Sequence, residues 1–291
     1  MTRTPAADSG ESAHGISRDI PLAAADGHRF TLLARIPDRA ERALLWLPAL
    51  GVAARHYLPL ADALAARGVA VFVHEWRGNG SSSLRAGRGC DWGYRELLQC
   101  DLPASDAAIS AALPAAARVL GGHSLGGQLA CCRLALDPRS ARSLWLVASG
   151  APYWRAFPPP LRWALPLAYR FLPWLADMRG ALPGRRIGFG GNEARGLIRD
   201  WARSALSGRY AAEGLDQDLE ARLAGIEVPV RATVLREDWL APESSLRFLL
   251  SKLPRSPVQV AGLDADLLRA RADHFAWMRE PEAVAAFLAG S

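Results

Sequence analysis

The chain has 291 residues, of which half are hydrophobic and 22% are charged. This composition supplies enough apolar material for a large buried core and argues against extended disorder. The formal net charge is +6, but Lys252 is the only lysine and the arginines are spread along the chain between acidic residues. The densest basic group is the pair Arg185 and Arg186, which is too small to follow a phosphate backbone, so we expect no nucleic-acid partner.

Two stretches bear on targeting and membranes. Residues 1–15 are polar and lack the apolar run of a signal peptide, so we interpret them as a flexible N-terminus. Residues 161–176 are the most apolar long stretch, but they contain Pro166 and Pro173 and two arginines. They should not insert stably into a membrane, and the prolines should also interrupt a helix lying on its surface. We expect a cytoplasmic protein.

The first part of the chain predicts a hairpin followed by a parallel sheet. Residues 17–23 and 29–36 alternate in polarity on either side of Asp26-Gly27, a dipeptide typical of tight hairpin turns. Residues 43–47 and 69–73 are compact apolar runs, and residues 57–67 between them have apolar side chains at helical spacing. A strand, a helix and a strand in this order predict two parallel strands joined by a covering helix.

The alternation continues, is interrupted once, and resumes. Helices are predicted at 102–113 and 126–136, and strands at 118–120 and 143–148. Residues 150–210 then carry seven prolines and four tryptophans, which central strands of a sheet cannot accommodate. Strand and helix alternate again to the end of the chain, with strands predicted at 230–235 and 258–260 and helices at 244–253 and 281–288.

These patterns together predict an α/β fold: a doubly wound, mostly parallel sheet with an inserted helical cap. We place the core in residues 16–150 and 216–291 and the cap in residues 151–215.

The most specific motif is Gly122-His123-Ser124-Leu125-Gly126, which is followed by Gly127. It lies between a predicted strand and a predicted helix, where small residues allow a sharp turn that projects the serine hydroxyl beyond the sheet. The turn also places the Leu125 amide at the start of a helix, where unpaired N–H groups favour anions. This context indicates a nucleophilic serine at position 124.

A serine nucleophile requires a base and, usually, an acid that orients the base. His274 is the one histidine that follows Ser124, in a predicted loop at the carboxyl edge of the sheet. Asp238 follows the strand predicted at 230–235, which fits the chain order serine, acid, histidine. Glu237, and then Asp264 and Asp266, are the alternatives for the acid.

A second hydrogen-bond donor for a developing oxyanion is expected after the first parallel strand. The loop there reads Leu47-Pro48-Ala49-Leu50-Gly51, and the backbone N–H of Leu50 is the candidate, opposite that of Leu125. Neither a metal nor an organic cofactor is expected for this chemistry.

At this point the sequence resembles the α/β-hydrolase superfamily along nearly its full length. More narrowly, it is similar to a bacterial group of predicted serine-aminopeptidase-like α/β hydrolases of undefined substrate. The resemblance rests on the segments 48–68, 76–82 (WRGNGSS), 121–130 (GGHSLGGQLA), 149–155 and 237–242. It implies the α/β-hydrolase fold, the Ser-His-Asp triad and a late cap. One departure concerns the oxyanion loop, which often begins His-Gly in the superfamily and reads Pro48-Ala49 here.

These features predict a carboxylesterase-like serine hydrolase that cleaves an ester or thioester of a small or acyl-chain substrate. Three aromatic residues soon after a strand end, Tyr153, Trp154 and Phe157, are the candidates for binding the acyl group, although they could equally attach the cap to the core. An aminopeptidase or amidase would need a carboxylate in the cap, for which Asp177, Glu193 and Glu213 are available. An acyltransferase with the same triad and a non-catalytic, hydrolase-like receptor or scaffold are further alternatives. The oligomeric state is not predicted.

Overall fold

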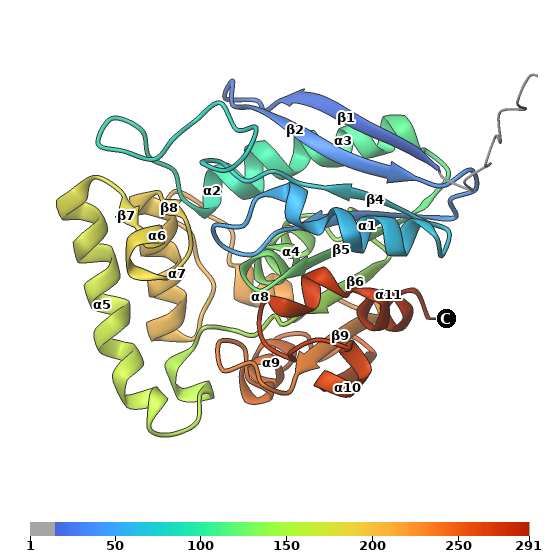
Figure 1. Ribbon diagram of the computed structural model, residues 1–291. Helices are drawn as coiled ribbons and strands as arrows, with labels where there is room; N and C mark the ends of the chain where they lie inside the picture. Colours follow the sequence, from blue (N-terminus) through green and yellow to red (C-terminus); the bar gives the residue numbers. More distant parts are fainter. Residues whose placement is uncertain (1–14, 291) are drawn as a thin grey trace, which may run out of the picture.

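The computed structural model of the protein describes residues 15–290 and is built around one eight-stranded sheet (Figure 1). The strand order is β1-β2-β4-β3-β5-β6-β9-β10. β1 and β2 form an antiparallel hairpin, and β2 pairs antiparallel with β4, while all other pairings in the sheet are parallel. The strands are β1 (Ile16–Ala23), β2 (Arg29–Ile36), β3 (Arg42–Leu47), β4 (Val69–Val73), β5 (Ala117–His123), β6 (Ser143–Val147), β9 (Val230–Leu235) and β10 (Val258–Leu263).

Helices cover both faces of the sheet, with α1 and α11 on one side and α3, α4 and α8 on the other. β3 is buried on both faces: Leu45 packs into the core on the α4 side, and Leu44 and Trp46 pack into the core on the α1 side. This explains its unbroken apolar sequence. The helices outside the inserted segment are α1 (Leu58–Ala65), α2 (Tyr94–Glu96), α3 (Leu102–Ala112), α4 (Leu125–Leu136), α8 (Leu219–Leu223), α9 (Glu243–Leu250), α10 (Ala265–Leu268) and α11 (Glu282–Ala289).

The predicted doubly wound, mostly parallel sheet is confirmed, including the hairpin around Asp26-Gly27. Three elements extend further than predicted, and one of them is the strand expected at 258–260, which is β10 and continues to Leu263. The strand expected at 118–120 is β5, which runs through two glycines to His123. The helix expected at 102–113 is preceded without a break by α2 and by a π-helical turn, Leu97–Asp101. The predicted flexible N-terminus, residues 1–15, lies outside the described residues except for Gly15.

Between β6 and β9 the chain leaves the sheet, and we refer to residues 151–215 as the inserted segment. It contains a two-stranded ribbon, β7 (Leu182–Pro183) with β8 (Asn192–Glu193), and the helices α5 (Leu161–Arg179), α6 (Gly184–Ile187) and α7 (Arg195–Ser207). The expectation that Pro166 and Pro173 would interrupt a helix was wrong, because α5 runs for 19 residues through both. Within residues 15–290, no helix combines the length and apolar character of a membrane span.

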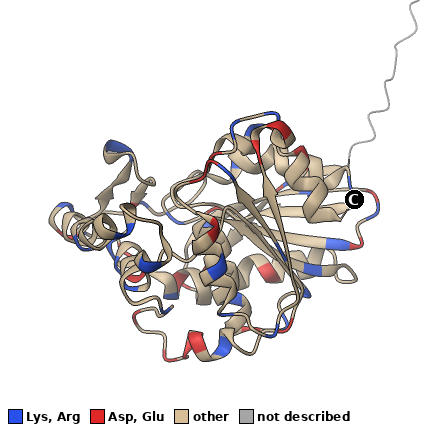
Figure 2. Cartoon of the chain, turned by 90° about the horizontal axis from the view of Figure 1, so that it is seen from below, with Lys and Arg blue, Asp and Glu red and all other residues tan. Residues whose placement is uncertain are grey.

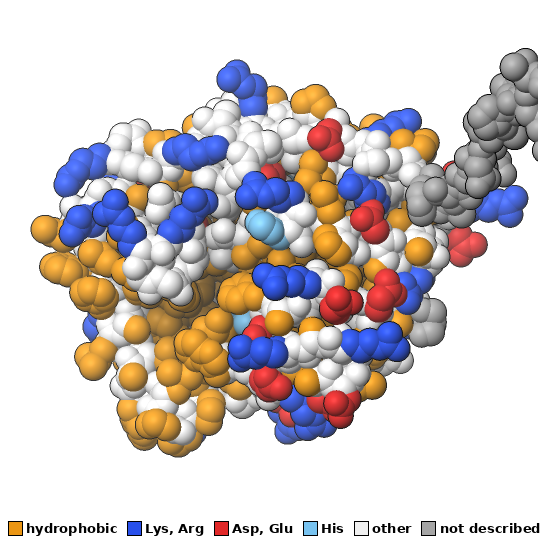
Figure 3. All heavy atoms as spheres, in the orientation of Figure 1, with side chains coloured by type: hydrophobic (Ala, Val, Ile, Leu, Met, Phe, Trp, Pro, Cys, Tyr) orange, Lys and Arg blue, Asp and Glu red, His pale blue; other side chains and the backbone are white. Residues whose placement is uncertain are grey.

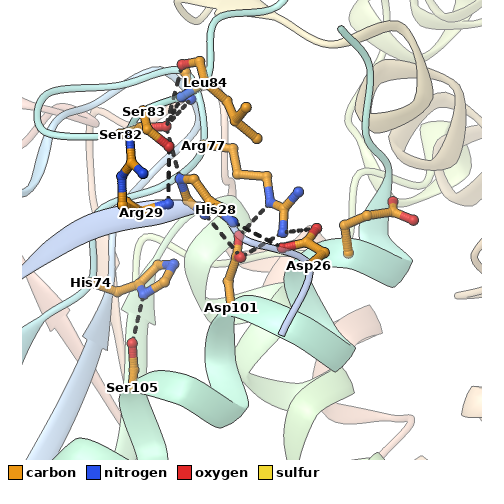
Figure 4. Close-up of polar contacts among 12 residues, drawn as sticks. Asp26, His28, Arg29, His74, Arg77, Ser82, Ser83, Leu84, Asp101 and Ser105 are labelled. Atoms are coloured by element: carbon orange, nitrogen blue, oxygen red, sulfur yellow. Dashed lines mark hydrogen bonds and ion pairs between the residues drawn. The ribbon is translucent and has the colours of Figure 1, made fainter. Parts of the chain in front are cut away.

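A buried polar cluster joins the hairpin to the π-helical turn (Figure 4). Asp101 accepts two hydrogen bonds of 2.7 Å from the Arg77 guanidinium, and its Oδ1 lies 3.0 Å from His28 Nδ1. The other His28 nitrogen lies 2.9 Å from Ser82 Oγ, and Arg77 also pairs with Asp26. Burial alone would raise the pKa of Asp101, but the bonds from His28 and Arg77 and the positive charge of Arg77 lower it below its usual value.

We predict that Asp101→Asn lowers the free energy of unfolding at pH 7 by about 3 kcal/mol, because Arg77 loses its buried partner. The pKa of Asp101 is lower in the folded than in the unfolded state. The contribution of ionised Asp101 to the free energy of unfolding is therefore present above about pH 4. It is lost as the pH falls through the pKa that Asp101 has in the folded state. Urea unfolding followed by circular dichroism measures this effect at pH 7 and pH 3.5. The difference in the free energy of unfolding between variant and wild type should be smaller at pH 3.5 than at pH 7.

Asp62→Asn is the matched control. Asp62 pairs with Arg35 at the surface, so we expect a change of less than about 1 kcal/mol. Equal effects of the two substitutions would contradict the role given to the buried cluster.

Candidate functional site

Ser124 sits at a sharp turn between β5 and α4. Its backbone has φ 55° and ψ −120°, a region that L-residues rarely adopt. The turn requires close backbone contacts: a Cβ on Gly122 would lie 2.4 Å from the carbonyl carbon of Gly126, and a Cβ on Gly126 would lie 2.0 Å from the carbonyl oxygen of Leu47. Only glycine fits at these two positions, which explains the spacing of glycine around the serine.

His274 and Asp238 lie together at the carboxyl ends of neighbouring strands. His274 Nδ1 is 2.7 Å from Asp238 Oδ2, and both side chains are buried. The second carboxylate oxygen of Asp238 accepts hydrogen bonds from the N–H groups of Leu240 and Ala241, at 2.9 and 3.0 Å. Trp277 Nε1 donates to the carbonyl of His274 at 3.0 Å and so holds the loop. Asp238 is therefore held firmly beside the imidazole of His274.

The alternative carboxylates have other partners. Glu237 faces Arg271 at 3.9 Å, and Asp264 Oδ1 accepts the N–H of Leu267 at the start of α10. The structure thus places Asp238, rather than either of these two, beside His274.

Ser124, Leu125, Leu50 and His274 all line one cavity of about 480 Å³, a size typical of small-molecule sites. The opposite wall comes from α5 and α7 of the inserted segment. The space-filling view shows a hollow with hydrophobic walls near the α5 end of the molecule (Figure 3). Apolar side chains make up most of the wall: Phe157, Leu161, Leu165, Leu172, Ile187, Phe189, Trp201, Trp239, Leu240 and Phe275.

Of the three aromatic residues predicted to bind the acyl group, Phe157 is on the cavity wall. Tyr153 and Trp154 are not among the lining residues. The Tyr153 ring packs on Phe248 at a centroid distance of 4.8 Å, and Trp154 packs near Trp163. Because Phe248 is on α9, the Tyr153 contact attaches the inserted segment to the core, which was the other interpretation of the aromatic group. The contact of Trp154 with Trp163 lies within the inserted segment.

A hydrogen-bonded chain behind the cavity was not predicted from the sequence. The Tyr57 hydroxyl accepts the N–H of Ala49 at 2.9 Å and lies 2.8 Å from His123 Nδ1. Burial, and the nearby His274, lower the pKa of His123 well below its usual value, so the ring is neutral and accepts the Tyr57 proton. Tyr57 thereby links the loop that carries Leu50 to the turn that carries Ser124.

Comparison with known proteins identifies the family. Residues 38–261, about three quarters of the chain, match the family described as serine aminopeptidase, S33. The chain belongs to this family of α/β hydrolases. The comparison with curated proteins gives no match.

Solved structures similar to this hydrolase share its fold at low sequence identity. DcsB, solved in complex with its substrate analogue, has a TM-score of 0.63 at 15% identity over 94% of this chain and 97% of its own. An N-acyl homoserine lactone degrading enzyme has a TM-score of 0.58 at 18% identity, covering 93% and 99%. A hydrolase from Pseudomonas aeruginosa has a TM-score of 0.56 at 21% identity, covering 97% and 98%.

Gln128 is a further cavity residue of this hydrolase that sequence reasoning missed. It is buried on α4, four residues after Ser124, and its side-chain Oε1 has no hydrogen-bond partner within residues 15–290. The spacing could have indicated it, since residues four apart on a helix lie on the same side. A carboxamide without a partner on an apolar wall is available to a bound molecule.

The inserted segment contacts the loop after β3 through glycines. A Cβ on Gly51, which has φ 74°, would lie 2.0 Å from the backbone nitrogen of Gly191. Glu193 Oε1 accepts the N–H of Gly191 at 2.7 Å, and burial raises the pKa of this carboxyl to about 7. The position of the Leu50 loop in this hydrolase therefore depends on the inserted segment as well as on Tyr57.

We predict that Tyr57→Phe lowers the free energy of unfolding by about 1–3 kcal/mol, because the Ala49 N–H loses its buried acceptor. Hydrolase activity should fall by about tenfold or more as the Leu50 loop loosens, mostly through kcat. Thermal unfolding and steady-state kinetics measure the two effects. Tyr153→Phe, which keeps the ring contact with Phe248 and lies outside the cavity wall, should change neither, and unchanged kinetics in Tyr57→Phe would refute the link.

Proposed function

We propose that this hydrolase cleaves an ester or thioester of a small or acyl-chain substrate, with Ser124 as nucleophile, His274 as general base and Asp238 as the orienting acid. His274 takes the Ser124 proton as the oxygen attacks the carbonyl carbon. The protonated imidazole then gives that proton to the leaving alcohol or thiol, which departs and leaves an acyl-enzyme. Water, deprotonated by the same histidine, releases the acid and regenerates the serine.

The proposed oxyanion donors are the backbone N–H groups of Leu125 and Leu50. Both residues line the cavity with Ser124, and no hydrogen bond between residues 15–290 uses either N–H. The Leu125 group is also at the N-terminus of α4, where the helix dipole favours negative charge. Donors fixed in this way stabilise a tetrahedral intermediate without reorganising during the reaction.

The absence of acidic side chains on the cavity wall favours an ester over an aminopeptidase substrate. No Asp or Glu of the described part of the chain is among the lining residues. The three carboxylates considered for holding an amine are occupied elsewhere: Asp177 pairs with Arg199, Glu213 faces Arg203, and Glu193 is bonded to Gly191. An ammonium group brought into this apolar cavity would lose its hydration without gaining a partner charge. This observation carries the choice of substrate class.

An acyltransferase would use the same steps up to the acyl-enzyme and differ in the acceptor. A non-catalytic receptor is disfavoured by the pairing of His274 with Asp238 at 2.7 Å, an arrangement that ligand binding alone does not need. The labelling and ester-hydrolysis experiment described next distinguishes both alternatives from a hydrolase.

We predict that wild type is labelled covalently by a fluorophosphonate and hydrolyses p-nitrophenyl esters. Ser124→Ala should abolish labelling, and His274→Ala should reduce kcat about 10⁴-fold or more. Asp238→Asn should reduce kcat by about 10³–10⁴-fold. His56→Ala, which removes an exposed histidine, is the matched control and should keep full activity. Intact-mass detection and steady-state kinetics give the readouts.

An amino-acid p-nitroanilide assayed in parallel tests the aminopeptidase alternative, and faster turnover of the anilide than of the esters would overturn the ester assignment. A burst of p-nitrophenol followed by turnover only on adding alcohols would indicate an acyltransferase. Folded wild type that neither labels nor turns over would favour the receptor.

We predict that Gln128 selects acyl chains that carry a polar group. The test compares two p-nitrophenyl esters of equal chain length, one with an unsubstituted acyl chain and one with a hydroxy- or oxo-substituted chain. Gln128→Leu should raise the ratio of kcat/KM for the unsubstituted ester to kcat/KM for the substituted ester by about tenfold, because leucine cannot form a hydrogen bond. Leu172→Met, a change on the same wall without polar consequence, is the control. An unchanged ratio in Gln128→Leu would refute this selectivity.

A further inference from the structure

The outer side of α5 carries a row of exposed hydrophobic side chains, which we call the α5 stripe. Its residues are spaced by four, four, three and four along an unbroken helix, so they lie on one side of it. They are Trp163, Leu167, Phe171, Trp174 and Met178, exposed by 66, 72, 51, 56 and 58%. Soluble monomers rarely expose so many large apolar groups together, and such patches mark interaction sites.

The α5 stripe takes little part in packing within the molecule: Trp163 lies near Trp154, and Phe171 and Trp174 contact each other. A different side of α5 lines the cavity with Leu161, Leu165 and Leu172, and packs on α7 through the edge-to-face contact of Tyr169 with Trp201. The stripe is therefore an additional apolar surface on a helix whose inner side is already occupied.

Further exposed apolar residues surround the opening of the cavity. Ile187, Trp239 and Phe275 line the cavity and are also between 44 and 65% exposed. They come from α6, from the loop after β9 and from the loop of His274. Hydrophobic side chains accordingly gather around the hollow and along the α5 end of the molecule in Figure 3. One end of the molecule thus combines the mouth of the cavity with an apolar outer surface.

The same end carries the positive charge of the protein. The inserted segment has ten arginines and four acidic residues, a net charge of +6, which equals the formal net charge of the whole chain. Two of the four acidic residues, Glu193 and Asp200, are buried. The remainder of the chain is neutral on balance. Figure 2 colours many positions on this part of the chain as basic, and in Figure 3 basic side chains lie beside the apolar ones.

We propose that the inserted segment docks on an anionic lipid surface, with the α5 stripe in the interfacial layer and the arginines among the headgroups. Tryptophan and long apolar side chains favour this layer, and each arginine close to an anionic leaflet adds to the attraction. The expectation that Pro166 and Pro173 would interrupt an interfacial helix does not apply, because α5 is continuous through both.

Charge distinguishes this partner from a second copy of the chain. Two inserted segments facing each other would bring +6 against +6, whereas an anionic bilayer neutralises the arginines. The docking stands on the surface alone and does not depend on the proposed catalytic role of Ser124.

The test is co-sedimentation of the full chain with vesicles of phosphatidylcholine, with and without 30% phosphatidylglycerol. We expect binding that requires phosphatidylglycerol, weakens with added salt, and shifts tryptophan emission to shorter wavelength. Leu167→Ser should weaken the vesicle affinity by about tenfold, the effect expected from removing one large apolar side chain from the lipid. Leu267→Ser, which changes another exposed leucine (58% against 72% for Leu167) on α10, is the matched control and should bind like wild type.

Circular dichroism and thermal unfolding, which need no enzymatic activity, check that both variants are folded. Equal affinities for the two lipid compositions, or equal effects of the two leucine substitutions, would overturn the proposal. A dimer in size-exclusion chromatography that Leu167→Ser converts to a monomer would also overturn it, by assigning the α5 stripe to a subunit interface.

Discussion

The turn at Ser124 requires glycine, which has no side chain, at two nearby positions. Gly122 and Gly126 approach other backbone atoms so closely that any Cβ would collide, and this allows Ser124 to keep a positive φ between β5 and α4. The same contacts hold the carboxyl ends of β3 and β5 against the first turn of α4. They therefore also fix the start of the loop after β3 relative to Ser124. The turn thus positions Leu125, and together with Tyr57 and the glycine contacts of the inserted segment it positions the Leu50 loop on the same cavity.

The sequence predicted those parts of the site that local rules determine. The glycine spacing marks the turn, and the order of Ser124, Asp238 and His274 along a parallel sheet places all three at one edge, because successive strands end on the same side. The 2.7 Å contact between His274 and Asp238 agrees with that expectation of proximity.

Other features could not be predicted because they depend on contacts between distant segments. Tyr57 looks like an ordinary apolar helix residue in the sequence, and only the folded chain brings its hydroxyl to Ala49 and His123. α5 was expected to break at its prolines, since proline lacks an N–H and opposes helix continuation. Packing of α5 on α7 and on the β7–β8 ribbon supplies the tertiary stabilisation that a local rule cannot include.

The uneven distribution of charge has a consequence for how the molecule moves. A neutral body with a positively charged end has a large electric dipole moment along the axis from the sheet to the inserted segment. Near any strongly negative surface such a molecule experiences a torque, and it turns its charged end forward before contact. Since the mouth of the cavity is at that end, orientation in the field would shorten the rotational search that precedes a productive encounter.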